Sequence, residues 1–158
     1  MKVEYKLIEA PARLLMALLF LMSATIKVTE TSGIQAYMQA YGVPEMLVWP
    51  AAAWEYAAGV LLLVGYYIRP ISLLLAGWCV ITALIFHAKF SDLDQLMNFF
   101  KNMTMAGGFL VFAMNGSRGG SIDAKLAPRG RAARLGATRS AANVRLHGRK
   151  LLARAGMR

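Results

Sequence analysis

Residues 47–68, LVWPAAAWEYAAGVLLLVGYYI, decide the fold, because they form a long apolar stretch with one charged side chain, Glu55, inside it. A helix needs about 20 such residues to cross the hydrocarbon core of a bilayer. A carboxylate at that depth is costly, so it should face a protein interior or a polar cavity and find a partner. Cationic candidates stand near the ends of the neighbouring apolar segments: Arg13, Lys27, Arg69, His87 and Lys101. The sequence therefore predicts a small bundle of membrane helices with a polar cluster inside it.

Three further apolar segments resemble the first in length. Pro11, Pro50 and Pro70 stand at the expected starts of three of the four segments, where the missing N–H is no loss to a helix. Asn115-Gly116 is a helix-stop signal at the end of the fourth. Hydrophobic residues make up 58% of the chain and charged residues only 16%, whereas soluble domains have about 25% charged residues. We predict an all-α fold, a four-transmembrane-helix bundle, with helices over residues 10–27, 47–68, 70–88 and 96–114.

The net charge of +10 belongs to one part of the chain. Residues 1–116 hold seven basic and seven acidic side chains, whereas residues 117–158 hold eleven basic side chains against Asp123. We therefore expect a transmembrane domain over 1–116 and a basic, flexible tail over 117–158. Anionic lipid headgroups are the expected partner of this tail. Nucleic acid is not expected, because no aromatic residues interleave with the arginines.

The distribution of Lys and Arg also predicts the orientation. The N-terminal flank, the turn near Arg69 and the C-terminal flank fall on one side of a four-span topology, and together they are more basic than the opposite side. The positive-inside rule places both termini in the cytoplasm of a multi-pass protein.

This topology places several polar side chains in the same half of the bundle. The candidate intramembrane cluster consists of Glu55, Lys27, His87, Lys101 and Asn102, with Arg13 and Arg69 as secondary members. Glu55 is either a structural residue that pairs the helices or a proton acceptor or ligand contact. Lys27 either extends toward the headgroups or turns inward to Glu55. Small residues that let helices approach closely are Gly59, Gly65, Gly107 and Gly108.

Several chemistries have no residues to carry them. A single cysteine, Cys79, allows neither an internal disulfide nor a dithiol relay. The bundle does not offer two imidazoles for haem ligation, since His147 lies in the tail and only His87 is near the bundle. No metal-ligand spacing and no nucleotide-binding fingerprint occurs in the sequence. We expect no metal and no catalysis by this chain on its own.

The residues resemble the DoxX family of small bacterial inner-membrane proteins. The resemblance rests on the run RLLMALLFLMSATIK over residues 13–27, on Gly42-Val43-Pro44, and on FFKN over residues 99–102 followed by Gly107-Gly108. It also includes Glu55, Gly59, Gly65, Arg69 and His87. It covers about residues 8–115, and Ala24 stands where many members have glycine. It implies a four-helix bundle in the bacterial inner membrane, associated with respiratory or thiol-redox systems; the family name comes from a subunit of a quinone-linked sulfur oxidoreductase.

Three functions follow as hypotheses. The first is an accessory or docking subunit of a membrane redox or respiratory system, with a membrane or redox protein as partner. The second is a quinone-binding component of a membrane oxidoreductase, in which His87, Lys101 or Glu55 contacts the quinone head group. The third is a pathway for a small solute or protons through the polar cluster. Faces rich in Gly and Ala also permit a homo-oligomer.

Overall fold

The computed structural model describes residues 5–117 and 120–126, with side chains from Ile8 onward. The described residues form α-helices and a short 3₁₀ turn, without a strand, which confirms the predicted all-α bundle. The elements are α1 (Tyr5–Thr29), α2 (Thr31–Ala40), the 3₁₀ turn Glu45–Leu47, α3 (Val48–Val64), α4 (Ile68–Phe86), α5 (Leu93–Asn115) and α6 (Ile122–Leu126). The chain divides into two compact units, residues 1–125 and 126–158. The predicted flexible tail lies outside the described residues from residue 127 onward.

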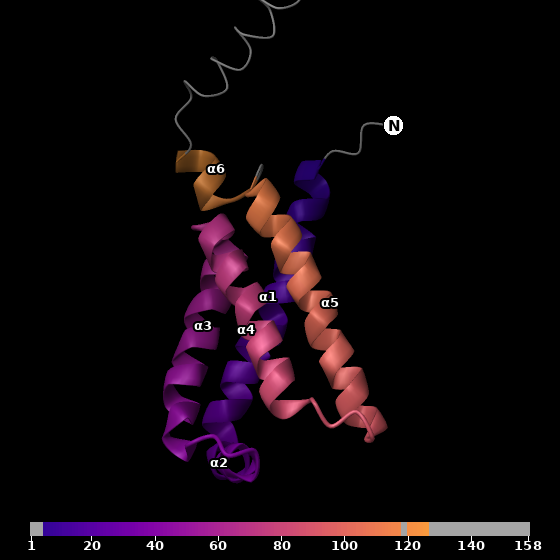
Figure 1. The fold of residues 1–158 in the computed structure, drawn as a ribbon. Helices are drawn as coiled ribbons and strands as arrows, with labels where there is room; N and C mark the ends of the chain where they lie inside the picture. Colours follow the sequence, from indigo (N-terminus) through magenta and orange to yellow (C-terminus); the bar gives the residue numbers. More distant parts are fainter. Residues whose placement is uncertain (1–4, 118–119, 127–158) are drawn as a thin grey trace, which may run out of the picture. The chain divides into compact units, whose positions relative to one another are not determined.

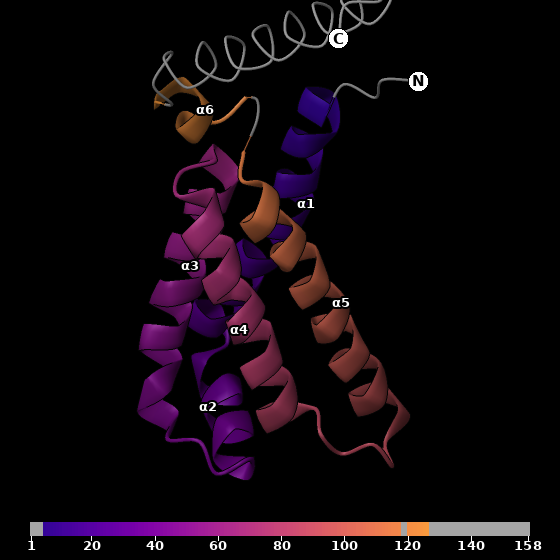
Figure 2. The same cartoon turned by 45° about the horizontal axis from the view of Figure 1, so that its top comes forward.

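The four long helices of the first unit form two pairs. The most extensive packing joins α1 to α3 and α4 to α5, whereas α3 and α4 contact each other far less. The start of α1, the α3–α4 turn and the end of α5 lie at one end of this unit, here called the terminal end (Figure 1). Helix α2 and the α4–α5 connection lie at the opposite end, the loop end, as the second view also shows (Figure 2).

Among the described residues, three segments are long and apolar enough to cross a membrane by length and composition. They are Ile8–Thr29, Glu45–Val64 and Ile68–Phe86, with mean hydropathies of 1.6, 1.6 and 1.9. Helix α5 has 23 residues, but Asp94, Lys101 and several amide side chains lower its apolar character. That α5 also crosses the membrane stays a prediction.

The turn between α3 and α4 comes earlier than the sequence pattern predicts. Helix α3 ends at Val64, because Gly65 adopts a left-handed conformation with φ 73°. Its backbone N–H caps the helix by donating to the carbonyls of Leu61 and Leu62. Tyr67, the only non-glycine residue with positive φ in the described chain, precedes α4 with φ 51°. The predicted helices over 47–68 and 70–88 thus shorten and shift to 48–64 and 68–86.

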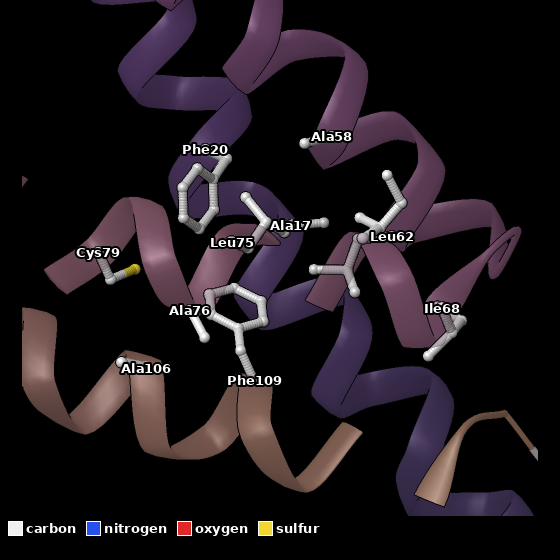
Figure 3. Close-up of a cluster of buried hydrophobic side chains, with 11 residues drawn as sticks. Ala17, Phe20, Ala58, Leu62, Ile68, Leu75, Ala76, Cys79, Ala106 and Phe109 are labelled. Atoms are coloured by element: carbon white, nitrogen blue, oxygen red, sulfur yellow. The ribbon is translucent and has the colours of Figure 1, made fainter. Parts of the chain in front are cut away.

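An apolar core fills the middle of the bundle (Figure 3). Phe20 of α1 meets Phe109 of α5 edge-on, with ring centroids 5.5 Å apart, and Leu62 and Leu75 are fully buried beside them. At Gly59, an added Cβ would lie 3.0 Å from a methyl of Leu21, so glycine permits the close approach of α1 and α3. The outer faces of the helices are apolar too, which suits contact with lipid.

The first residues of the predicted tail belong to the helical unit. Beyond α5, residues 120–125 fold back onto the α3–α4 turn, where the backbone N–H of Asp123 donates to the carbonyl of Gly65 at 3.0 Å. The expected boundary at residue 116 follows from composition, which does not register these polar contacts.

Replacing Gly65 by alanine should destabilise the bundle. The left-handed conformation costs an L-residue about 1–2 kcal/mol, and a Cβ would also collide with the Arg13 guanidinium and Ser121. Thermal unfolding in detergent should therefore begin several degrees lower for Gly65→Ala. Gly77→Ala is the matched control, because nothing lies within 4 Å of its added Cβ. Equal midpoints for the two variants would contradict this assignment.

Candidate functional site

Helix α3 places Glu55 on its inner face, where only 4% of the residue is exposed. One carboxylate oxygen, Oε2, lies 2.8 Å from Nζ of Lys27 on α1. The other, Oε1, accepts a hydrogen bond from the indole N–H of Trp78 on α4, at 3.0 Å. One side chain in the middle of an apolar helix therefore connects three helices. We call Glu55, Lys27, Trp78 and Ser23 the intramembrane tie.

Lys27 comes from the last turn of α1 and turns inward. Its ammonium group donates to Glu55 and also to the hydroxyl of Ser23, one helical turn earlier, at 2.8 Å. The side chain is 18% exposed, so most of its length lies within the protein. Of the two alternatives from the sequence, the structure therefore has the inward ion pair.

The pairing follows from the electrostatics of a weakly polar interior. Two opposite charges attract strongly at low dielectric constant, but each has lost its hydration and depends on the other and on hydrogen bonds. Trp78 supplies the second partner of Glu55, and Ser23 supplies the second partner of Lys27. The Trp54 ring packs edge-on against Trp78, with centroids 6.3 Å apart, and shields this side of the tie.

The other predicted members of the cluster have different partners. His87 pairs through Nδ1 with Oε1 of Gln95 at 2.7 Å, across the α4–α5 connection. Lys101 is exposed on α5 and reaches Asn98 at 3.4 Å. Asn102 accepts a hydrogen bond from Thr82 at 3.5 Å, and Thr82 in turn donates to the Trp78 carbonyl.

Thus, of the five predicted residues, only Glu55 and Lys27 are in direct contact. Asn102 is connected to Trp78 by way of the Thr82 hydroxyl. His87 lies at the loop end, and Lys101 lies on the outer face of α5. The five share a half of the bundle, as the topology implies, but they do not share a side of it.

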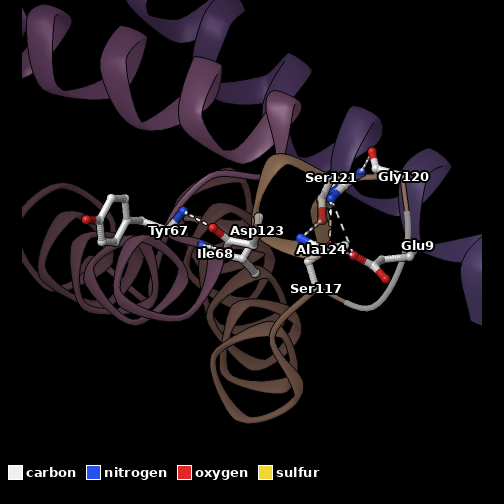
Figure 4. Close-up of polar contacts among 9 residues, drawn as sticks. Glu9, Tyr67, Ile68, Ser117, Gly120, Ser121, Asp123 and Ala124 are labelled. Carbon is white, nitrogen blue, oxygen red and sulfur yellow. Dashed lines mark hydrogen bonds and ion pairs between the residues drawn. The ribbon is translucent and has the colours of Figure 1, made fainter. Parts of the chain in front are cut away.

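Arg13, a secondary candidate from the sequence, forms a second polar centre with Ser117 and Gly120, partners that the sequence does not indicate. It is 2% exposed and lies at the terminal end. Its Nη1 donates to Glu9 at 3.3 Å and to the Ser117 hydroxyl at 3.0 Å, and its Nη2 donates to the Gly120 carbonyl at 2.9 Å. The Ser117 hydroxyl also donates to Glu9, as the side chains in Figure 4 show. The sequence holds one signal for this site: Glu9 stands four residues before Arg13 on the same helix.

Asp123 completes the polar contacts at the terminal end. Its two carboxylate oxygens accept the backbone N–H groups of Tyr67 and Ile68, each at 2.9 Å (Figure 4). These N–H groups open α4, and a carboxylate at a helix N-terminus is favourable for both hydrogen bonding and the helix dipole. Arg69, a secondary candidate, is exposed in this first turn and extends past Gly116.

The remaining predicted packing glycines differ in their surroundings. A Cβ on Gly108 would lie 3.2 Å from the end of Met16, so α5 approaches α1 there, whereas Gly107 faces open space. Gly65 serves the α3–α4 turn.

A groove of about 530 Å³ runs between α1 and α3, beside the intramembrane tie. Its lining is mostly apolar, with aromatic rings at the edge, and consists of Ala24, Thr25, Val28, Thr29, Trp49, Ala52, Ala53, Tyr56 and Ala57. This volume lies in the range of small-molecule sites, about 300–1,000 Å³. Among the residues that the structure describes, no group of three His, Cys, Asp or Glu side chains is placed to hold a metal ion.

At the loop end, α2 packs an aromatic cluster against the end of α4. The rings of Tyr37, Tyr41 and Phe86 have centroids 4.9–5.6 Å apart, and the Tyr37 hydroxyl donates to the Phe86 carbonyl at 3.4 Å. Burial, reinforced by the neighbouring Tyr41 hydroxyl, raises the pKa of Tyr37 to about 12.

The fold and the intramembrane tie define a helical membrane protein built around a buried ion pair. The DoxX family model matches residues 9–88, which include most of α1 and all of α2, α3 and α4, with Lys27, Glu55 and Trp78. The chain is 38% identical over 112 residues to inner membrane protein YqjF of Escherichia coli K12, covering 71% of this chain and 86% of that protein. It is 29% identical over 120 residues to inner membrane protein YphA of the same organism, covering 71% and 85%. No solved structure matches. The chain belongs to the DoxX family.

Breaking the ion pair should destabilise the protein far more than removing it whole. Glu55→Gln or Lys27→Met leaves one buried charge without its partner, which costs about 3–5 kcal/mol. The double variant Lys27→Met, Glu55→Gln should lie close to the wild type, because neither charge remains. Thermal unfolding in nanodiscs measures all three, and Lys101→Met serves as an exposed control with an effect below about 0.5 kcal/mol. Additive losses in the double variant would show that the two residues do not act as a pair.

Tyr37 should ionise late, and the protein should lose stability at alkaline pH as Tyr37 ionises. Because the fold raises its pKa from about 10 in the unfolded chain to about 12, its contribution to stability is complete below pH about 10 and is lost as the pH rises toward 12. In an ultraviolet titration, Tyr37→Phe should remove part of the late-ionising tyrosine signal. The denatured wild type, in which the environment of Tyr37 is lost, is the control; an unchanged late signal in Tyr37→Phe would refute the assignment.

Proposed function

We propose that this DoxX protein is a non-catalytic accessory subunit that docks to a redox or respiratory protein in the bacterial inner membrane, with both termini in the cytoplasm. One observation carries the proposal: the charges of the intramembrane tie are satisfied by each other. Both oxygens of Glu55 and the ammonium group of Lys27 have partners inside the bundle. Such a tie holds α1, α3 and α4 in place and leaves the apolar outer faces to meet lipid or another protein.

The association with redox systems rests on the resemblance to the DoxX family alone. The accessory role is supported by the geometry of the tie, whose charged groups are all paired within the bundle. The basic segment 117–158 adds a contact with anionic headgroups, worth about 1 kcal/mol per basic residue near the surface. Its charge is a property of the sequence, and most of it lies outside the described residues.

A second candidate function is quinone binding in the groove between α1 and α3. Its volume and apolar lining suit a quinone ring or part of an isoprenoid chain, and Tyr56 and Thr29 offer hydroxyl groups there. The three side chains that the sequence offers for the quinone head are less suitable than these hydroxyl groups. Glu55 is buried and paired, His87 pairs with Gln95, and Lys101 lies on the outer face of α5.

The pathway hypothesis finds less support in the described part of the chain. The intramembrane tie and the Arg13 centre are separated by buried apolar residues along the inner face of α1, namely Ala17 and Phe20. Polar side chains thus gather at two levels with an apolar layer between them.

The accessory role predicts that a redox protein binds in stoichiometric amount and that this binding persists when the intramembrane charges are removed. The tagged wild type and the double variant Lys27→Met, Glu55→Gln, expressed at native level, should recover the same partner from mild detergent. Tryptophan at one of the exposed lipid-facing positions Leu15, Leu84 and Val111 should lower the recovery about tenfold or more, since a bulky ring disturbs close packing between helices.

Absence of a partner, together with a quinone that co-purifies with the wild type and is lost in Tyr56→Ala, would replace the accessory role by quinone binding. Partner loss in the charge-free double variant, with its stability unchanged, would contradict the purely structural role of the tie.

A further inference from the structure

We propose that Ser117 and residues 120–125 form a polar latch, which closes the terminal end of the bundle by holding α1 to the α4–α5 pair. Opening of the latch lets α1 and α5 separate there, while the short α3–α4 turn keeps α3 and α4 together. This inference does not depend on the proposed function. It starts from the pairing of α1 with α3 and of α4 with α5, between which the packing of α3 on α4 is much less extensive.

The latch contacts both pairs through charged groups. On the first pair, Arg13 of α1 donates to the Ser117 hydroxyl and to the Gly120 carbonyl, at 3.0 and 2.9 Å. On the second pair, Asp123 accepts the N–H groups of Tyr67 and Ile68 at the start of α4. Because the latch also follows α5 in the chain, it holds α1, α4 and α5 at one point.

The latch is seated in the protein and does not lie loosely on it. Arg13 and Ser121 are each 2% exposed, and the Ser121 hydroxyl accepts the backbone N–H of Ala124 at 3.1 Å to begin α6. Arg13 and Ser121 can pack against residue 65 only because it is glycine, since a Cβ there would collide with both. The carbonyl of Gly65 in turn accepts the N–H of Asp123.

The hydrogen bonds around Arg13 are coupled, so breaking one is expected to weaken the others. Arg13, Glu9 and Ser117 are mutually hydrogen-bonded, so loss of one changes the others. The apolar contacts between the pairs, such as Phe20 with Phe109, are not directional in the way that these hydrogen bonds are. The latch therefore restrains the terminal end. It also lies in the chain between α5 and residues 127–158.

The test uses the full chain in nanodiscs with two readouts. Asp123→Asn weakens the hold on α4, and Ser117→Ala is the milder variant that removes one hydroxyl from the Arg13 centre. Asp92→Asn is the matched control, because Asp92 caps α5 at the loop end in the same way, accepting N–H groups of Asp94 and Gln95. Hydrogen exchange reports on the N–H groups of Tyr67 and Ile68. Spin labels at Leu15 on α1 and Val111 on α5, both exposed, report on the separation of these two helices, with Cys79→Ala as the background.

Asp123→Asn should raise exchange at residues 67–68 roughly tenfold or more, as expected for loss of a charged hydrogen bond. It should also broaden the distance distribution between the labels; Ser117→Ala should broaden it less, and Asp92→Asn should leave it unchanged. Faster exchange at 67–68 with an unchanged distance distribution would reduce the segment to a helix cap and overturn the latch. If Asp123→Asn does not fold, an unchanged distance distribution in Ser117→Ala overturns it equally.

Discussion

The structure depends on one constraint: a charge inside an apolar helix bundle must find its counter-charge inside the same bundle. Glu55 meets that constraint by drawing Lys27 inward from the end of α1 and by accepting the indole N–H of Trp78. Because these residues come from three helices, the pair determines how α1, α3 and α4 face one another. Apolar packing alone is less selective, since lipid tails compete for the same surfaces.

The same constraint operates a second time at the other end of α1. Arg13 and Lys27 are fourteen residues apart, which is about 21 Å along a helix, and each has its own set of partners from distant parts of the chain. Between them lies the apolar layer around Phe20 and Phe109. The bundle thus has two polar ties with a dry core between them, an arrangement that favours a fixed scaffold over a polar passage.

The fold and half of the site were predictable from the sequence, for a physical reason. A lone carboxylate in a long apolar segment must turn inward, and Lys27 is the cation that ends the preceding long helix on the side of the membrane where the helix of Glu55 begins. His87, Lys101 and Asn102 were grouped with them because topology gives depth in the membrane but not the direction around a helix axis. Lys101 has the right depth and faces outward.

Trp78 and the Arg13 centre were missed for different reasons. An indole N–H in an apolar helix carries no distinguishing sequence signal. Ser117, Gly120 and Asp123 stand in a stretch whose composition is that of a basic tail, so composition hid the few residues that fold back. The α3–α4 turn was placed too late because Tyr66 and Tyr67 continue the apolar run, although Gly65 already ends the helix.

The most direct test of this account is a solid-state NMR measurement on the wild type in lipid bilayers, with the Lys27 side-chain nitrogen and the Glu55 carboxylate carbon labelled. The account predicts a strong dipolar contact between the two, consistent with the 2.8 Å separation of Nζ and Oε2. A missing contact, with the Lys27 ammonium protons exchanging freely with bulk water, would show that Lys27 extends to the headgroups and that the intramembrane tie does not exist.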